Sequence, residues 1–545
     1  MFLFVAGSFL SCKEPRVNIE EKTVVETPEE INTKAEDVIQ GTLKAIEAGD
    51  KSISDSVRVR HAGILYALYE KNSFRPLWST EGTFISVVDS FLLLTDSAML
   101  YGLFPEDYNQ QRIRQLHTLL ATDTSRETHL DVSRWAYTDL LLTSAFVQMV
   151  RDIKSGRLLP DSILNRDSIV TIDFLAEKLE AFRKTPVYEF AASLEPANTD
   201  YHRLREALPA FLRKADMRRY TRVVSRDSSR IPALVYQRIS EEDTLDITAS
   251  PDSLQVASAV KRYQKRKKLK ADGKITAGLI DRLNNTDREK FIRIAITLDR
   301  FKMMPPLPVQ YIWVNIPGYY LQVRDSDSVV LQSKVVVGKP ETKTPIITSA
   351  ISDMITYPKW HIPESIIKKE ILPGLKKDPG YTVRRGYSLL DSKGNEIDPY
   401  TVQWAKYTSS IPYRVVQGSG DDNALGVLKF NFPNKFAVYL HDTNQRYLFS
   451  RSARSLSHGC VRVQSWLELA KFILHNDSLA VQTALPVDSL NAWLERKEKH
   501  VIPVRKRIPL YIRYVTCDAK DGKVIFYEDI YGEDRKLRDK IFHGK

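Results

Sequence analysis

A cysteine and two histidines fall close together late in this 545-residue chain. Cys460 lies in the run SHGCVR, with His458 two residues before it and His441, in YLHDT, nineteen residues before it. A thiol becomes a strong nucleophile at neutral pH when a nearby imidazole can take its proton, and backbone amides around Gly459 could hold the oxygen of an attacked carbonyl. Since the chain has only three cysteines, this pattern predicts a covalent cysteine enzyme.

The sequence around these residues predicts the elements that position them. Between residues 299 and 480, runs such as VQYIWVNIPGYYLQVRD alternate apolar and polar side chains between Gly, Pro and Asp turns, as antiparallel strands do. In KFAVYLH a strand period of two sends Tyr439 and His441 to the same face. VRV predicts a short strand and SWLELAKFIL a helix, so we expect Cys460 at a turn that leads into buried structure.

Two helical regions precede these strands. From residue 51 to 235, apolar residues recur at spacings of three and four in runs such as VSRWAYTDLLLTSAFVQMVRDI, which predicts a helical scaffold domain. Residues 236–290 predict a small helical module, in which ADGK makes a turn and Thr276 caps a second helix. Because the chain is too long for one compact core, we expect a multidomain α+β protein whose third part, residues 299–480, is mainly β.

The N-terminal residues predict a targeting signal. MFLFVAGSFLSC is an apolar run that ends in small residues and Cys12, and residues 1–12 resemble a bacterial lipoprotein signal. Lipidation of Cys12 would anchor the protein to a membrane, and an ordinary secretory signal is the alternative. Residues 13–50 are polar, acidic and poor in aromatics, which predicts a flexible tether with a reach on the order of 100 Å. No later apolar run predicts another spanning helix.

The net charge of +12 points to an anionic neighbour, which could be nucleic acid, membrane lipid or a polymer of the cell envelope. The basic run KRYQKRKKLK lies in the small module and, by itself, could bind nucleic acid or be a solvated helix face. Together with the following ADGK, it resembles the peptidoglycan-binding module of cell-wall enzymes. A wall-binding role fits a secreted chain better, so we expect no nucleic-acid partner.

His441, the spacer after it and SHGCVRV resemble the active-site signature of the L,D-transpeptidases of bacterial cell-wall synthesis, whose catalytic domain is of the YkuD type. The runs YPKWHIPESI and QGSGDDNALGVLKFNFPN strengthen the likeness. With a helical scaffold and an adjacent wall-binding module, the chain resembles the large scaffold-bearing branch of that family.

That resemblance implies an enzyme that acts on peptidoglycan stem peptides without a cofactor or a metal. Cys460 would attack the third residue of a tetrapeptide stem, release the terminal D-alanine and hold the rest as a thioester, and an amine of a neighbouring stem would complete a 3→3 cross-link. His441 would move the protons, oriented by the main-chain carbonyl of Asp442. The amides of Gly459 and Cys460, with the Tyr439 hydroxyl as a further donor, would form the oxyanion hole. A zinc site is disfavoured because no paired CxxC supplies its remaining ligands.

Five further residues are expected to contact substrate. His458 could instead be the base for the thiol, and Arg462 could instead lock the turn by hydrogen bonds. An aromatic-rich segment, residues 355–415, would by family resemblance be a loop that covers the substrate, unless its rings only pack a small core of their own. The expected substrate contacts are Ser457, His458, Arg462, Trp360 and Trp404.

Residues 481–545 predict a C-terminal extension with a hairpin that turns at Asp521 and Gly522, and Cys517 falls in its first strand as a packed thiol. The resemblance implies a protein of the cell envelope, in the periplasm and anchored through Cys12. Two other functions remain open: water could replace the acceptor amine, or the chain could be an inactive wall-binding lipoprotein. The presence of both Cys460 and His441 favours an enzyme.

Overall fold

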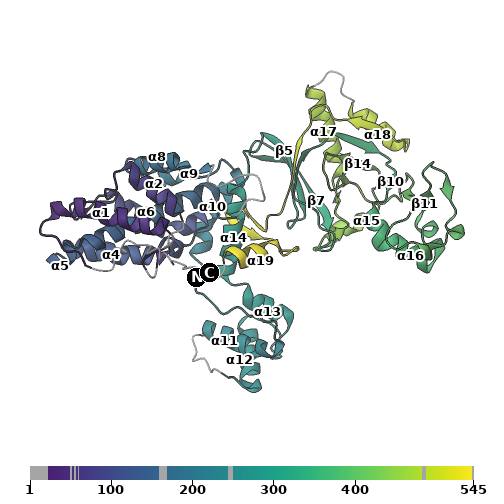
Figure 1. Ribbon diagram of the computed structural model, residues 1–545. Coiled ribbons are helices and arrows are strands. Elements are labelled where there is room, and N and C mark those ends of the chain that lie inside the picture. The colour runs from purple at the N-terminus through teal and green to yellow at the C-terminus, as the bar shows by residue number, and fades with distance from the viewer. Residues whose placement is uncertain are drawn as a thin grey trace, which may run out of the picture. The chain divides into compact units, whose positions relative to one another are not determined.

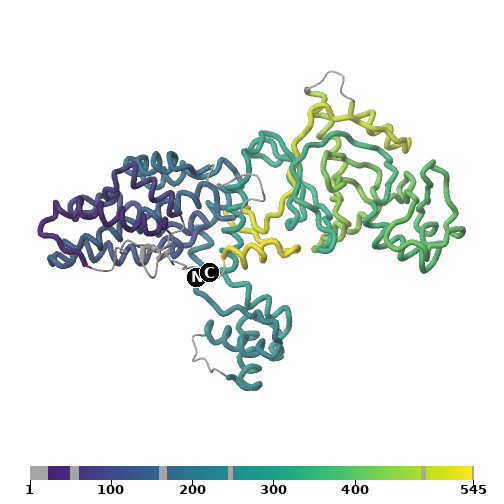
Figure 2. Tube along the Cα trace, in the orientation of Figure 1, coloured from purple at the N-terminus to yellow at the C-terminus, as the bar shows by residue number. Residues whose placement is uncertain are grey.

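The computed structural model describes residues 22–48, 52–54, 57–58, 61–158, 169–243, 250–480 and 486–542. The chain divides into two compact units, which are described separately (Figures 1 and 2). Unit 1 comprises residues 1–306 with the segments 518–525 and 537–545, and unit 2 comprises residues 307–517 and 526–536. A helical first unit and a mainly-β second unit confirm the predicted multidomain α+β organisation.

Unit 1 is built around the long helix α6 (Val132–Ser155), which is buried along nearly all of its length. A helix that is apolar on most faces needs neighbours all round, and five other helices contact it. These are α1 (Pro28–Glu47), α2 (Ala62–Lys71), α4 (Gln110–Thr122), α9 (Val187–Leu194) and α14 (Asp287–Lys302), and α3 (Val87–Asp96), α8 (Ile172–Phe182) and α10 (Thr199–Leu212) complete the bundle.

Helix α1 corrects the predicted tether. Residues 28–47 form a regular helix that packs against α6, so they are part of the helical domain and not a flexible chain. Acidic residues in its first turn gave the segment a disorder-like composition, whereas its buried residues recur at helical spacing on one face. Cys12 and residues 13–21 lie outside the described residues. The buried stripe of α1 consists of Ile31, Ala35, Val38, Ile39, Thr42, Leu43 and Ile46.

The small module has three helices rather than two. Helices α12 (Ser253–Arg266) and α13 (Ala277–Asn284) pack with α11 (Ile231–Asp243) around a shared core, so the module begins before residue 236. Thr276 caps α13 as predicted, because its hydroxyl accepts a hydrogen bond from the Leu279 amide at 3.2 Å. Part of the basic run is paired within the module: Arg266 and Lys267 both form ion pairs with Glu242.

The β domain begins later in the chain than predicted, because helix α14 belongs to unit 1. Residue 299 was expected to open the β domain, but Asp299 is completely buried in unit 1. Its carboxylate accepts hydrogen bonds from Arg157 and Lys302, each at 3.1 Å. A buried carboxylate with two cationic partners ties the end of α14 to the helical core, and unit 2 starts at residue 307.

Unit 2 is organised by one large, strongly curved sheet. Its strand order is β18-β9-β14-β15-β17-β7-β6-β5-β19-β8, with β16 paired to β7. Helix α17 (Trp466–Ala480) contributes Leu469 and Ile473 to the core beneath this sheet. The strands are β5 (Gln310–Asn315), β6 (Tyr320–Asp325), β7 (Ser328–Gly338), β8 (Ile347–Ala350), β9 (Asp353–Thr356), β14 (Leu428–Asn431), β15 (Leu440–His441), β16 (Ser455–Ser457), β17 (Val461–Val463), β18 (Val501–Pro503) and β19 (Pro509–Arg513).

Two short strands of this sheet position the predicted active-site residues. Strands β15 and β17 pair in parallel, with His441 opposite Arg462, and β14 pairs with β15 so that Lys429 lies opposite His441. The predicted strand through KFAVYLH is shorter than expected, because Ala437 has a positive φ of 54° and regular pairing begins only at Leu440. Tyr439 and His441 nevertheless lie side by side, with ring centroids 5.7 Å apart.

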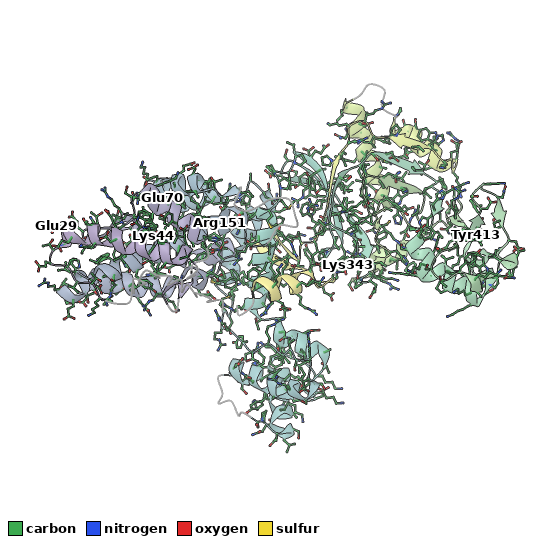
Figure 3. The ribbon with its side chains drawn as sticks, viewed as in Figure 1. Glu29, Lys44, Glu70, Arg151, Lys343 and Tyr413 are labelled. Atoms are coloured by element: carbon green, nitrogen blue, oxygen red, sulfur yellow. The ribbon has the colours of Figure 1, made fainter. Side chains whose placement is uncertain are left out.

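The predicted covering loop is a folded lobe with its own sheet and core. We use the name lobe for residues 360–417, which contain strands in the order β10-β13-β11-β12 and a cluster of buried side chains (Figure 1). Tyr413, labelled in Figure 3, packs against this cluster. The lobe's elements are β10 (Trp360–His361), α15 (Glu364–Ile366), the π-helical turn Ile367–Ile371, α16 (Leu372–Lys377), β11 (Tyr387–Leu390), β12 (Glu396–Ile397) and β13 (Arg414–Gln417).

The C-terminal segment is divided between two structures. Strand β19 joins the main sheet between β5 and β8, which the predicted boundary at residue 480 did not foresee. The hairpin that follows consists of β20 (Cys517–Lys520) and β21 (Lys523–Phe526), and it turns at Asp521 and Gly522 as predicted, both with positive φ. Cys517 is completely buried at its start. No helix among the described residues has the length and apolar composition needed to cross a bilayer.

Candidate active site

Cys460 lies in the turn between β16 and β17, where its side chain is half-exposed. The turn depends on Gly459, whose φ of 124° is one that residues with side chains rarely adopt. Ser457 fixes the same turn, because its buried hydroxyl donates to the Cys460 carbonyl at 2.6 Å and accepts from the Gly459 amide at 3.1 Å. Ser457 therefore holds the nucleophile's backbone, and this bonding leaves its hydroxyl no free proton for the predicted substrate contact.

The hydrogen bond from the Gly459 amide to Ser457 changes which amides are available for the predicted oxyanion hole. The Gly459 N–H is committed to Ser457, so it does not serve as a free donor. The Cys460 N–H donates to no backbone acceptor within the described residues. Of the two amides predicted for the oxyanion hole, only that of Cys460 is unoccupied.

His441 is 4% exposed at the end of β15. Its Nδ1 makes a short hydrogen bond to the main-chain carbonyl of Asp442, which is the orientation expected from the sequence. Because a carbonyl can only accept, Nδ1 carries the proton, and Nε2 is left with the lone pair that a base needs. The parallel pairing of β15 with β17 brings this imidazole next to the turn that holds Cys460.

The surroundings keep both members of this pair uncharged. Burial, reinforced by the nearby charge of Arg462, lowers the pKa of His441 to about 3. Burial raises the pKa of the Cys460 thiol above its ordinary value. At neutral pH the site therefore rests as a neutral thiol beside a neutral imidazole, and the thiolate has to form during the attack itself.

A second layer of residues holds the Asp442 backbone in place. The Asp442 carboxylate accepts hydrogen bonds from the Val427 amide at 3.1 Å and from Arg446 at 2.9 Å. Gly426 leaves room for it, since a Cβ at that position would lie 2.3 Å from an Asp442 oxygen. These residues were not identified from the sequence, because nothing in their spacing indicates that they converge on His441.

Two cations flank the pair. Arg462 lines the cavity at Cys460 and donates to Gln445 at 2.8 Å, which fits its alternative prediction as a residue that locks the turn. Lys429 was missed by the sequence analysis, and its ammonium lies 4.1 Å from the centre of the Tyr439 ring. Burial lowers the pKa of Lys429. Lys429 could have been identified from its position opposite His441 in the pairing of β14 with β15, but the sequence alone does not show which strands pair.

Comparison with known proteins agrees with this geometry. Residues 309–487 match the family model of the L,D-transpeptidase catalytic domain, and residues 64–208 match that of a scaffold domain. The chain contains an L,D-transpeptidase catalytic domain. A Haemophilus influenzae protein provisionally named an L,D-transpeptidase is 37% identical over 245 residues, which are 45% of this chain and 48% of that protein. The chain thus spans about half the length of the curated relative it matches.

In the L,D-transpeptidase domain the cysteine lines a cavity of about 110 Å³ between the sheet and the lobe. The lobe supplies Trp360, Pro363 and Ile366 to the wall, so Trp360 lies at the site as predicted. The prediction for Trp404 is wrong: it is 4% exposed within the lobe's own core, where its indole N–H donates to the Pro399 carbonyl at 2.8 Å. For this ring, the alternative that it only packs the lobe holds.

His458 joins the lobe to the nucleophile's turn. Its Nε2 makes a short contact with the Glu370 carboxylate on the lobe's π-helical turn. The imidazole also lines the cavity at Cys460 and a second cavity beside it. In this structure Nδ1 of His441, not of His458, is fixed by a backbone carbonyl, so His441 is the better-oriented base for the thiol.

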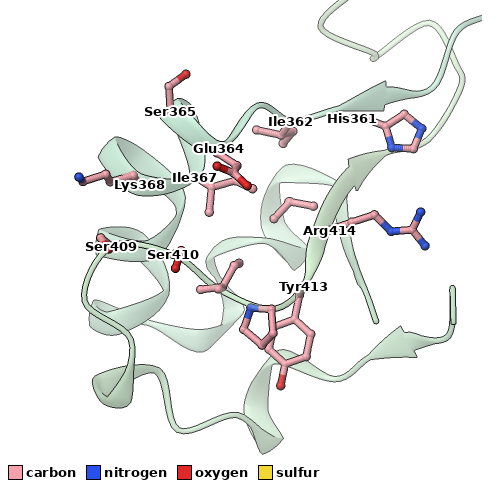
Figure 4. Close-up of a pocket in the computed structure, with 13 residues that line it drawn as sticks. His361, Ile362, Glu364, Ser365, Ile367, Lys368, Ser409, Ser410, Tyr413 and Arg414 are labelled. Carbon is pink, nitrogen blue, oxygen red and sulfur yellow. The ribbon is translucent and has the colours of Figure 1, made fainter. Parts of the chain in front are cut away.

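A larger cavity of about 570 Å³ lies within the lobe and does not include the cysteine (Figure 4). Lys368, Ser409 and Ser410 line one side of it, and His361 and Arg414 line the other. The size of this cavity does not make it the catalytic centre, since no nucleophile with a paired base faces it. The L,D-transpeptidase domain therefore has its candidate active site in the smaller cavity.

Proposed function

We propose that this protein is a peptidoglycan L,D-transpeptidase that forms 3→3 cross-links through a thioester on Cys460. The observation that carries the proposal is that a half-exposed thiol and a carbonyl-oriented His441 line the same cavity in a domain of this family. The donor is a tetrapeptide stem of peptidoglycan, and the acceptor is an amine of a second stem.

In the first half-reaction His441 Nε2 takes the thiol proton as Cys460 Sγ bonds to the carbonyl carbon of the third stem residue. The resulting oxyanion is held by the Cys460 amide and the Tyr439 hydroxyl, and losing one such donor typically costs about 3 kcal/mol. Burial raises the pKa of Tyr439, which keeps its hydroxyl protonated and able to donate. Collapse breaks the amide bond, and His441 returns its proton to the departing D-alanine nitrogen.

Lys429 and Arg462 support this step electrostatically. The negative charge moves from sulfur to oxygen as the carbonyl is attacked, and a nearby positive charge stabilises it at either position. Both side chains are partly withdrawn from water, where such interactions are stronger than at the surface. Neither cation needs to transfer a proton for this role.

The rest of the chain fits an insoluble substrate of the cell envelope. The three-helix module is proposed to bind peptidoglycan, and Cys12 to carry a lipid that holds the protein at a membrane in the periplasm. Because α1 packs into the helical domain and Val24 bridges to Asp131, residues 24–47 belong to this domain and not to the expected tether.

The test is incubation of the protein with a disaccharide-tetrapeptide and separation of the products by mass. Cross-linked dimers with release of D-alanine support the proposal, whereas tripeptide alone means that water is the acceptor and the enzyme is a hydrolase. Cys460→Ala should abolish every product. Cys517→Ala removes the other thiol in the described part of the chain and should retain activity, because Cys517 is buried away from the cavity. Absence of any Cys460-dependent product would refute an enzymatic role.

A further inference from the structure

The proposed reaction has to move protons from two different groups. Acylation removes one proton from a thiol, which His441 can accept. Transfer begins with an acceptor amine, and a primary amine of ordinary pKa, about 10, arrives at neutral pH as an ammonium ion. That ion must lose one proton before it has a lone pair, and a second when its nitrogen bonds to the carbonyl.

His441 is poorly suited to the first of these losses. Burial lowers its pKa to about 3, so it is a much weaker base than the amine it would have to deprotonate. It is also almost completely buried, whereas an ammonium ion enters from solvent. A second base that is open to solvent could meet the ammonium ion as it enters and pass the proton on to water.

The structure places such a group two residues from the nucleophile. His458 Nε2 bonds to the Glu370 carboxylate, and both side chains are about one-third to two-fifths exposed, at 32% and 42%. A carboxylate accepts but does not donate, so Nε2 carries a proton, and in the neutral imidazole Nδ1 is the nitrogen with the lone pair. Glu370 lies on a π-helical turn, an irregularity that is frequent at functional sites, and it lines the neighbouring cavity together with His458.

The cavity next to His458 suits an amine that carries its own carboxylate. It has a volume of about 250 Å³ and shares Ser365, Ile366 and His458 with the catalytic cavity. Its lining includes two ammonium groups and two carboxylates, so it presents both charges that a zwitterionic ligand needs. These are Lys339, Lys369, Glu341 and Glu370.

We propose that the His458–Glu370 pair is the proton acceptor for the incoming amine, and that this amine is part of a zwitterionic amino-acid centre bound in the neighbouring cavity. The inference rests on the proposed transpeptidase function. His458 Nδ1 takes one proton from the ammonium and, being partly exposed, releases it to solvent. The free amine attacks the thioester carbonyl, the new C–N bond forms, and the C–S bond breaks. The second nitrogen proton passes through His441 Nε2 to Cys460 Sγ, which restores the thiol.

The test measures the reaction of two amines, the acceptor stem and hydroxylamine, with the acyl-enzyme of the wild type and of the variant Glu370→Gln. Acyl-enzyme formation, followed by intact mass and D-alanine release, is expected to stay within about twofold of the wild type. Dimer formation should fall about 100-fold, the lower end of the usual general-base contribution. Hydroxylamine is uncharged at neutral pH and needs no prior deprotonation, so its attack on the acyl-enzyme should be unaffected. Dimer formation by the variant should recover about tenfold per pH unit, as solvent supplies more free amine.

Controls separate this role from a structural one. Glu364→Gln changes another carboxylate of the lobe, outside both cavities at His458, and should leave all three rates unchanged. If Glu370 only holds the lobe in place, acylation, hydroxylamine attack and dimer formation will fall together in Glu370→Gln, and the inference is wrong. Unchanged dimer formation in Glu370→Gln would also overturn it. If the wild-type protein forms no acyl-enzyme at all, the proposed function itself fails, and this inference fails with it.

Discussion

The reactivity of Cys460 across the pH range tests whether the enzyme rests with a neutral thiol. The perturbation is pH, and the probe is iodoacetamide, an uncharged reagent that reacts with the thiolate. Because burial raises the pKa of Cys460 above its ordinary value, only a small fraction of the thiol is ionised at pH 7. The alkylation rate should therefore rise about tenfold per unit, or about 100-fold between pH 6 and pH 8. A cysteine that rests as an ion pair with histidine has a pKa of about 3.5 to 7.5, so its rate would reach a plateau before pH 8.

The assay is the pseudo-first-order rate of adduct formation at Cys460, followed by intact mass. Cys460→Ala supplies the background, to which the buried Cys517 should contribute little on the same timescale. His441→Gln should leave the slope unchanged, because in a neutral pair the imidazole does not carry the charge that would depress the thiol pKa. A rate that reaches a plateau below pH 8 in the wild type, and loses that plateau in His441→Gln, would refute the neutral resting state.

Three further predictions concern the groups around this pair. His441 has a pKa of about 3 in the folded protein and 6.5 in the unfolded chain, so the unfolded chain takes up the proton first as pH falls. Lowering the pH from 8 to 5 should therefore remove about 2 kcal/mol from the free energy of unfolding of wild-type unit 2, relative to His441→Gln. Denaturant unfolding of both proteins at both pH values measures this difference. Gly426→Ala should destabilise the domain by more than the roughly 1 kcal/mol expected for the control Gly386→Ala. Both glycines have a positive φ, but only a Cβ at Gly426 would clash with Asp442. Equal unfolding midpoints for the two variants would contradict this prediction. Lys429→Met should slow alkylation of Cys460 at pH 7.5 by about tenfold through loss of a nearby positive charge, and an unchanged rate would exclude Lys429 from the site's electrostatics.

The sequence was most informative where function depends on neighbours along the chain. Cys460 and His441 could be identified because both lie in short, distinctive runs, and the carbonyl that orients the imidazole belongs to the very next residue. The hairpin turn at Asp521 and Gly522 and the Thr276 cap were equally local. Each of these features needs only a few consecutive residues to adopt the expected backbone.

Features that depend on distant contacts were misjudged or missed. Glu370 lies 88 positions before His458, and no spacing in the sequence indicates that the two meet. Trp360 and Trp404 looked equivalent as exposed rings of a loop, but the lobe has a core of its own, and only one of them faces the cavity. Helix α1 was mistaken for a tether because its composition is polar, although the burial of a narrow apolar stripe is enough to hold it.

The neutral state of Cys460 has a consequence for the lifetime of the enzyme. Oxidation to sulfenic acid and exchange with disulfides both proceed through the thiolate, so their rates follow the small fraction of sulfur that is ionised. The raised pKa of the thiol keeps this fraction low until a carbonyl is in place. In an oxidising compartment such as the periplasm, which is the location proposed for this protein, a thiol that is rarely ionised is oxidised more slowly than a resting thiolate.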